Sequence, residues 1–276
     1  MSLSHLRIRL VLLTVCVSGL TGCFLFPRYP LPQITGSPLS SSSSAQFLRQ
    51  VAENSEKLHT FRGLAVVQAS YPGGRDRFRQ VLVFEKPDKL RWEAFPLQGA
   101  YSLNVLVLRG ETLTFLDQSS SQAVIGTDCP EFVQEYLGLP LPVRALGGLL
   151  TGQLSWQTPV DEAEPSSLRL YQDDKSDRVI VVEGDFERYA EYERLTGILR
   201  KVQIRKDQEL LLEAHYNAAS ESDGIWLPRE IEVIVPAGRL TLVFSYSQQK
   251  MNTKIASELF ELQLPEARIE RRSPCR

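Results

Sequence analysis

The sequence has few of the residues from which metal sites, redox motifs and catalytic centres are built. It holds three histidines and four cysteines among 276 residues, and no two cysteines have the C-x-x-C spacing of a zinc or redox motif. It contains no G-x-S-x-G turn, no H-E-x-x-H pair and no phosphate-binding loop. The acidic cluster of Asp173, Asp174 and Asp177 lacks the glycine and the distal glutamate of a calcium loop. We therefore expect a protein without enzymatic activity, metal or cofactor.

An excess of positive charge and a long apolar run are also missing. The chain has 31 Lys+Arg against 33 Asp+Glu, a formal net charge of −2, and no basic cluster stands out. Nucleic acid is therefore not an expected partner. The apolar stretch of residues 10–20 is too short to cross a hydrocarbon core of about 30 Å as a helix.

The N-terminus has the pattern of an export signal. Arg7 and Arg9 precede that apolar stretch, which ends in Leu20, Thr21, Gly22 and Cys23. This arrangement resembles the lipobox of bacterial lipoprotein signal peptides. The resemblance implies cleavage after residue 22 and attachment of acyl chains such as palmitate to Cys23, which would hold the protein on a membrane. The alternatives are an uncleaved anchor and a buried helix.

Composition divides the remaining chain into a tether, one large domain and a tail. Residues 23–45 contain four prolines and a run of five serines, which predicts an extended tether. Residues 46–266 form the predicted domain, with a first helix over about residues 45–57. Residues 267–276 form the predicted C-terminal tail.

The domain has the pattern of short strands joined by turns. Alternating apolar residues and turn residues predict thirteen strands, interrupted by a helical pair over residues 130–137 and 142–150. Hairpin spacing favours an antiparallel sheet. We therefore expect a mainly β protein with a few helices (α+β), in which one large curved sheet has its concave face covered by helices. The predicted strands are residues 62–71, 77–85, 89–95, 102–109, 112–117, 122–126, 167–172, 178–182, 186–194, 197–206, 209–218, 226–235 and 239–248.

Three segments carry a resemblance to a known family. Residues 61–66 (FRGLAV), 90–99 (LRWEAFPLQG) and 137–142 (LGLPLP), the last followed by residues 149–152 (LLTG), resemble segments of the LolA/LolB-type lipoprotein carriers and receptors. The resemblance is greatest to the LolB-type receptor of the outer membrane. It implies an incomplete β-barrel with a helical lid over an apolar cavity.

Large apolar side chains on the proposed concave face and on the predicted helix over 142–150 are candidates for the wall of that cavity. The alternative for each of them is an ordinary place in the core. About three short helices can hardly cover a dozen strands, so we expect part of this face to be open to an apolar ligand. The candidates are Phe78, Leu82, Phe84, Leu90, Trp92, Val105, Val107, Phe115, Leu146, Leu149 and Leu150.

Leu97 and two cysteines are further candidates. Leu97 lies between Pro96 and the Gln98-Gly99 pair, so a turn is expected there, with the leucine free to contact a membrane or an acyl chain. The alternative is a packed leucine. If Cys23 is acylated, Cys129 and Cys275 remain to form a disulfide, or they are two unpaired thiols.

These observations lead to a hypothesis of function and a rival. We expect a lipid-anchored protein that binds acyl chains of lipoproteins or lipids in a half-barrel cavity, as a receptor or carrier, with a periplasmic carrier protein as a possible partner. The alternative is a non-enzymatic scaffold or accessory lipoprotein of an envelope assembly, with a filled core. Phe24 stands where an aspartate is associated with inner-membrane retention, which favours the outer membrane, facing the periplasm.

Overall fold

The computed structural model describes residues 29–154, 168–173, 176–184, 187–262, 264 and 268–271. Contacts divide the chain into a short unit of residues 1–31 and a large unit of residues 32–276. The predicted signal peptide, Cys23 and Cys275 lie outside the described residues.

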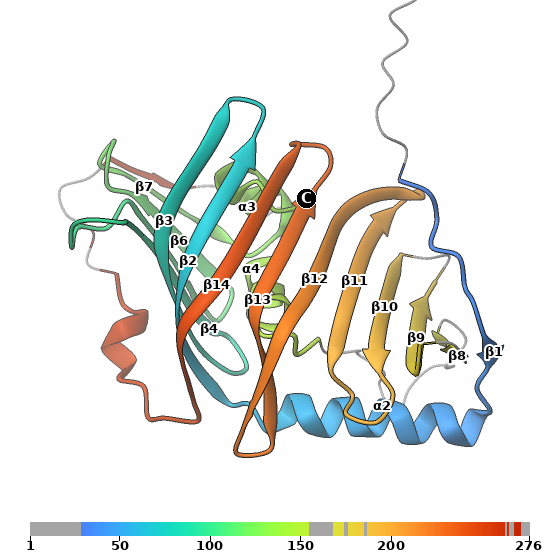
Figure 1. Cartoon of the computed structure of the whole chain (residues 1–276). Helices are drawn as coiled ribbons and strands as arrows, with labels where there is room; N and C mark the ends of the chain where they lie inside the picture. The colour runs from blue at the N-terminus through green and yellow to red at the C-terminus, as the bar shows by residue number, and fades with distance from the viewer. Residues whose placement is uncertain are drawn as a thin grey trace, which may run out of the picture. The chain divides into compact units, whose positions relative to one another are not determined.

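One sheet of fifteen strands forms the large unit, in the order β1-β8-β9-β10-β11-β12-β13-β14-β2-β3-β4-β5-β6-β7-β15. Neighbouring strands are antiparallel except β15, which pairs with β7 in parallel. The two ends of this order do not pair, so the curved sheet stays open (Figure 1). The predicted fold class is confirmed. The strands are β1 (Ser37–Pro38), β2 (Thr60–Tyr71), β3 (Gly74–Glu85), β4 (Lys89–Pro96), β5 (Asn104–Arg109), β6 (Thr112–Asp117), β7 (Gln122–Thr127), β8 (Leu168–Asp173), β9 (Arg178–Glu183), β10 (Arg188–Glu193), β11 (Leu199–Lys206), β12 (Glu209–Ser222), β13 (Ile225–Val235), β14 (Leu240–Met251) and β15 (Arg268–Arg271).

Alternation of apolar and polar residues gives the sheet two different faces. In β4, Leu90 and Trp92 are buried in the main core, whereas Arg91 and Glu93 point the other way and form an ion pair of 2.7 Å. Successive side chains of a strand point to opposite faces. We call the face that carries the main core the inner face and the opposite one the outer face.

In the described residues, three α-helices and one 3₁₀ helix accompany the sheet. They are α2 (Ser41–Glu56), α3 (Pro130–Leu137), α4 (Val143–Leu149) and η1 (Ser257–Phe260). α3 and α4 pack against the inner face, since their apolar residues belong to the main core (Figure 1). α2 lies against the β10–β11 turn, where the side-chain amides of Gln50 and Asn54 donate to the backbone oxygens of Leu195 and Thr196.

The structure differs from the prediction at both ends of the domain. α2 begins at Ser41, because Ser40 caps it by accepting a hydrogen bond from the backbone N–H of Ser43. The last four serines of the run are therefore helical, and the predicted tether over 23–45 ends earlier, since residues 37–38 already pair with β8. The predicted tail over 267–276 contains β15 at the opposite edge of the sheet.

Two small clusters cover parts of the outer face. One brings Val83, Val105 and Val107 under Ile255 and Phe260 of the segment that contains η1. The other packs Ile180, Val182 and Tyr189 beside Ile34. Val105 and Val107 are therefore wrong as candidates for a wall on the inner face. Their neighbours Leu106 and Leu108 occupy that face.

Candidate functional site

The segment from α3 to α4 fills the space over the inner face of the sheet; we call residues 130–151 the lid. α3 ends at Gly138, whose positive φ of 70° lets the chain turn away from the helix axis. The prolines that follow prevent the helix from continuing. Five leucines of the lid are buried in the main core, none more than 7% exposed: Leu139, Leu141, Leu146, Leu149 and Leu150.

The N-terminus of α4 is held by a carboxylate outside the helix. α4 follows Pro142, which has no side chain able to cap it. The buried carboxylate of Asp128 takes this place, accepting from the backbone N–H groups of Val143 and Arg144. It also forms an ion pair of 2.9 Å with the exposed guanidinium of Arg144. A negative charge at this position satisfies two free N–H groups and interacts well with the helix dipole.

The C-terminus of α4 is held from the sheet. The hydroxyl of Tyr246, on β14, donates to the backbone oxygen of Leu150 over 2.9 Å. Burial raises the pKa of Tyr246, so this hydroxyl stays a donor. Gly148 permits the chain to fold back beyond the helix, because a Cβ there would lie 2.8 Å from the backbone oxygen of Gln153. Asp128 and Tyr246 thus form a latch at the two ends of α4.

The remaining cavity candidates lie on the inner face but in a filled core. Leu82, Leu146, Leu149 and Leu150 are at most 1% exposed, and Phe84, Leu90, Trp92 and Phe115 are buried in the same cluster. Phe78 is half-buried beside them. The expectation of an open apolar cavity at these positions is therefore wrong. The lid side chains take the space that the prediction left for a ligand.

Leu97 lies in the bend that follows β4, and 43% of its surface is exposed. Arg79 holds the bend from β3, donating to the backbone oxygens of Pro96 and Gly99. Tyr101, further along the same connection, is 65% exposed. The loop therefore presents an aliphatic and an aromatic side chain to solvent. A contact of Leu97 with a membrane or an acyl chain stays a prediction.

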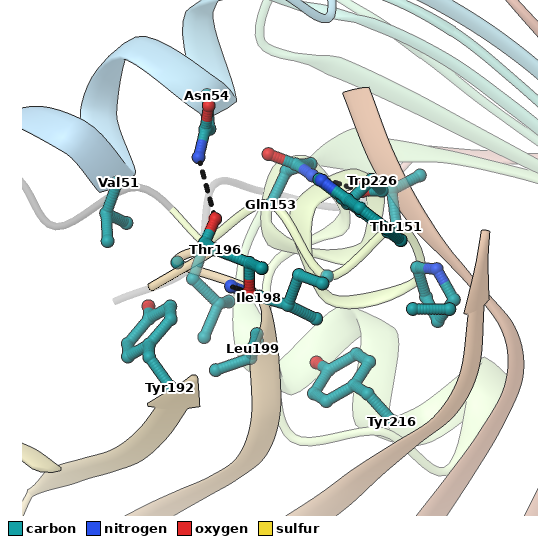
Figure 2. A pocket seen from close by; sticks show the side chains of 15 residues that line it. Val51, Asn54, Thr151, Gln153, Tyr192, Thr196, Ile198, Leu199, Tyr216 and Trp226 are labelled. Carbon is teal, nitrogen blue, oxygen red and sulfur yellow. Dashed lines mark hydrogen bonds between the residues drawn. The ribbon is translucent and has the colours of Figure 1, made fainter. Parts of the chain in front are cut away.

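A pocket opens between α2, the β10–β11 turn, the segment after α4 and the β12–β13 pair (Figure 2). Its cavity volume of about 20 Å³ is enough for one water molecule and far below the roughly 300–1,000 Å³ of most ligand sites. None of the predicted cavity residues lines it. The lining residues are Val51, Asn54, Thr151, Gly152, Gln153, Leu154, Tyr192, Thr196, Gly197, Ile198, Leu199, Tyr216, Ala219, Trp226 and Pro228.

Tyr216 is the chemically distinctive residue of this pocket. It is 3% exposed, and its hydroxyl has no hydrogen-bond partner. Burial, and then the nearby hydroxyls of Tyr192 and Tyr246, raise the pKa of Tyr216, so the group is a neutral phenol. Buried hydroxyls are normally hydrogen-bonded, so this atom requires an explanation.

The outer face carries a polar network around Glu213. His215 and Lys201 lie 2.6 Å and 3.4 Å from its carboxylate oxygens, and Gln203 donates to it as well. Burial alone would raise the pKa of Glu213, but these partners outweigh it and lower the pKa to about 2. Such a network across neighbouring strands stabilises the sheet.

Cys129 precedes α3 and is disulfide-bonded. Its predicted partner, Cys275, lies outside the described residues, so the pairing stays a prediction. Within the described part of the chain, no group of three metal-binding side chains comes together, and no helix is long and apolar enough to cross a membrane.

No family model matches the chain, and no curated protein matches it in sequence. Solved structures do share its fold. A protein named as an outer membrane lipoprotein-sorting domain, from Vibrio parahaemolyticus, matches with a TM-score of 0.55 at 8% identity, over 79% of this chain and 97% of its own. A DUF1329 family protein from Desulfovibrio piger matches with a TM-score of 0.53 at 11% identity, over 79% and 96%. A LolA superfamily protein from Nitrosomonas europaea matches with a TM-score of 0.51 at 13% identity, over 79% and 97%. The chain therefore has a LolA-like fold.

Proposed function

We propose that this chain is a lipid-anchored envelope protein that binds acyl chains of lipoproteins or lipids on its inner face, in place of the lid leucines. The observation that carries the proposal is the lid itself. It fills the concavity of the sheet with leucines from one short segment, and a polar latch holds α4 at both ends. A segment of this kind can leave the sheet while the strands stay paired.

Burial of the lid leucines and burial of an acyl chain contribute comparable free energies. Burying one leucine contributes about 1.5–3 kcal/mol, so the five lid leucines contribute about 8–15 kcal/mol. A chain of about fourteen methylenes, at about 0.8 kcal/mol each, contributes about 11 kcal/mol. Exchange of lid for ligand is therefore close to balanced. A carrier or receptor needs such a balance, because its ligand must be released.

The test is binding of a fluorescent palmitoyl probe to residues 24–276, expressed without the anchor. We expect saturable binding that palmitate competes away. Leu106→Trp, which adds bulk on the inner face, should weaken it. Val105→Trp places a tryptophan at the adjacent, equally buried position on the outer face and should leave binding unchanged. Circular dichroism establishes that each variant is folded.

A second function is favoured by the burial of the core. The lid leucines and the inner-face residues Leu82, Phe84, Leu90, Trp92 and Phe115 are all buried, as in a protein whose fold serves only to present surfaces. On this view the chain is a scaffold or accessory lipoprotein of an envelope assembly. A well-folded protein that binds no acyl probe would favour this function over the carrier.

The anchor and the location belong to the same proposal. The lipobox-like residues before Cys23 support lipidation, and Phe24 after it supports the outer membrane facing the periplasm. A receptor of LolB type would receive its ligand from a periplasmic carrier. Metabolic labelling with radioactive palmitate should mark the wild type and fail with Cys23→Ala. Membrane fractionation then identifies the membrane.

A further inference from the structure

The Tyr216 pocket lies beside the C-terminal half of the latch. Its lining continues directly from the end of α4, through Thr151 to Leu154, and Tyr246 binds the residue just before it. The pocket therefore lies next to the end of the lid. In Figure 2 the ring of Tyr216 lies at the lower edge of the drawn side chains, with its hydroxyl on the side of Leu199.

Three other polar side chains of the pocket already have partners. Asn54 donates to the backbone oxygen of Thr196, Gln153 donates to that of Trp226, and Thr151 donates to that of Gly147. The rest of the wall is largely apolar. A ligand for this pocket thus needs one acceptor atom for Tyr216 and an apolar body around it.

This requirement disfavours a charged group. A carboxylate would be buried without a cation, because none of the lining residues carries a positive charge. A neutral carbonyl at the head of an acyl chain meets the requirement with one hydrogen bond.

We propose that the Tyr216 pocket is the subsite for the neutral ester or amide carbonyl of an acylated ligand, whose chain continues beneath the lid. The proposal rests on the proposed acyl-binding function and adds the chemical class of the head group. Tyr216 donates to the carbonyl oxygen, and Trp226, 36% exposed, lies at the mouth. The subsite selects esters and amides over free fatty acids and over plain hydrocarbons.

The test is displacement of an apolar fluorescent reporter by methyl laurate, lauric acid and tridecane, which have chains of similar length. Wild type should prefer the ester over the other two. Tyr216→Phe should lose about five- to tenfold in affinity for the ester, the effect of one hydrogen bond, and should bind tridecane as before. Tyr189→Phe is the matched control, because its hydroxyl binds Glu191 on the outer face; it should change nothing.

Two further measurements distinguish the loss of the carbonyl contact from a loss of folding. Tyr216→Phe removes a buried, unpartnered hydroxyl, so the Tm of the free protein should stay the same or rise. Ala219→Trp fills the pocket and should abolish the ester preference, whereas Asn217→Trp, exposed on the same strand and outside the lining, should preserve it.

The possible results distinguish failure of the carbonyl subsite from failure of the proposed acyl-binding function. If wild type binds no reporter, both are overturned. If wild type binds the reporter but Tyr216→Phe leaves the ranking of the three competitors unchanged, only the carbonyl subsite is overturned. Competition by a triacylated lipopeptide and by a phospholipid identifies which lipid supplies the ester; displacement by neither overturns the subsite.

Discussion

Removing the carboxylate of Asp128 should open the lid without unfolding the sheet. Asp128→Ala leaves two N–H groups of α4 without an acceptor and breaks the ion pair with Arg144. An N-cap is worth about 1 kcal/mol, and hydrogen bonds to a buried charge raise this to about 2–3 kcal/mol. The ion pair adds little, because more than half of the Arg144 side chain is exposed.

A loss of about 2–3 kcal/mol corresponds to about a 30- to 150-fold rise in the population of the open lid. Hydrogen exchange followed by mass spectrometry should show this acceleration in residues 138–151 and a much smaller one in β2 and β14. If ligands bind the open state, the affinity for the palmitoyl probe should rise by up to the same factor. Arg144→Ala, which removes only the exposed partner, should change either quantity less than about fivefold.

Two results would refute this reasoning. Exchange that accelerates equally over the whole sheet would mean that α4 unfolds only with the rest of the domain. Faster exchange confined to the lid, with no gain in probe affinity, would mean that the open lid is not the state that binds acyl chains.

Three further predictions concern other parts of the molecule. The partners of Glu213 hold its pKa at about 2 in the folded state, so its contribution to the free energy of unfolding is complete above pH 4.5 and is lost as the pH falls towards 2. Urea titrations should therefore show that, between pH 6 and pH 3, the free energy of unfolding of the wild type falls by about 2 kcal/mol more than that of Glu213→Gln. Leu97→Glu should leave the Tm unchanged, since the side chain is 43% exposed, but should reduce binding to lipid vesicles in a flotation assay; unchanged flotation would exclude a membrane role for this loop. Residue 271 of β15 pairs with residue 125 of β7, and Cys275 and Cys129 each stand four positions later in the sequence, so peptide mapping should recover the predicted disulfide and Cys129→Ser should release β15 to proteolysis.

The first half of the sheet could be predicted closely from the sequence. β2 to β7 begin and end within three residues of the predicted bounds, because one face is buried, side chains alternate and glycine or proline marks the turns. α3 and α4 were recognisable from Pro130 and Pro142, which stand at or just before their first residues. Local patterns of this kind depend on neighbours in the chain and are visible in the sequence.

The faces of β5 could not be predicted in the same way. Val105, Leu106, Val107 and Leu108 are all buried, because the lid covers one face of the strand and the η1 segment covers the other. Four apolar residues in a row carry no alternation, so either pair could face inward. Val105 and Val107 face outward, where residues 255–260 cover them. These residues lie more than a hundred positions away, and the sequence does not associate them with β5.

The Tyr216 pocket had no local signal either. Its walls come from α2, the end of α4 and the β10–β13 strands, which are far apart in the sequence. Of the residues that the sequence analysis missed, Asp128 was the easier one to predict. A helix that follows Pro142 has no capping side chain of its own, and an acidic residue shortly before the helical pair is a natural candidate for that place.

We expect the latch and the pocket to be coupled, because both involve the end of α4. Tyr246 binds Leu150, and the pocket wall begins one residue later, so a ligand chain that extends from Tyr216 under the lid is expected to displace the hydrogen bond between Tyr246 and Leu150. Thermodynamic linkage is reciprocal. If opening the latch raises the affinity for the ester, binding of the ester must favour the open latch by the same free energy. Methyl laurate should therefore accelerate hydrogen exchange at the amides of α4 in the wild type, and do so less in Asp128→Ala, where the lid is already open more often. Exchange that slows on ester binding would place the whole ligand outside the closed lid and would separate the pocket from the acyl site.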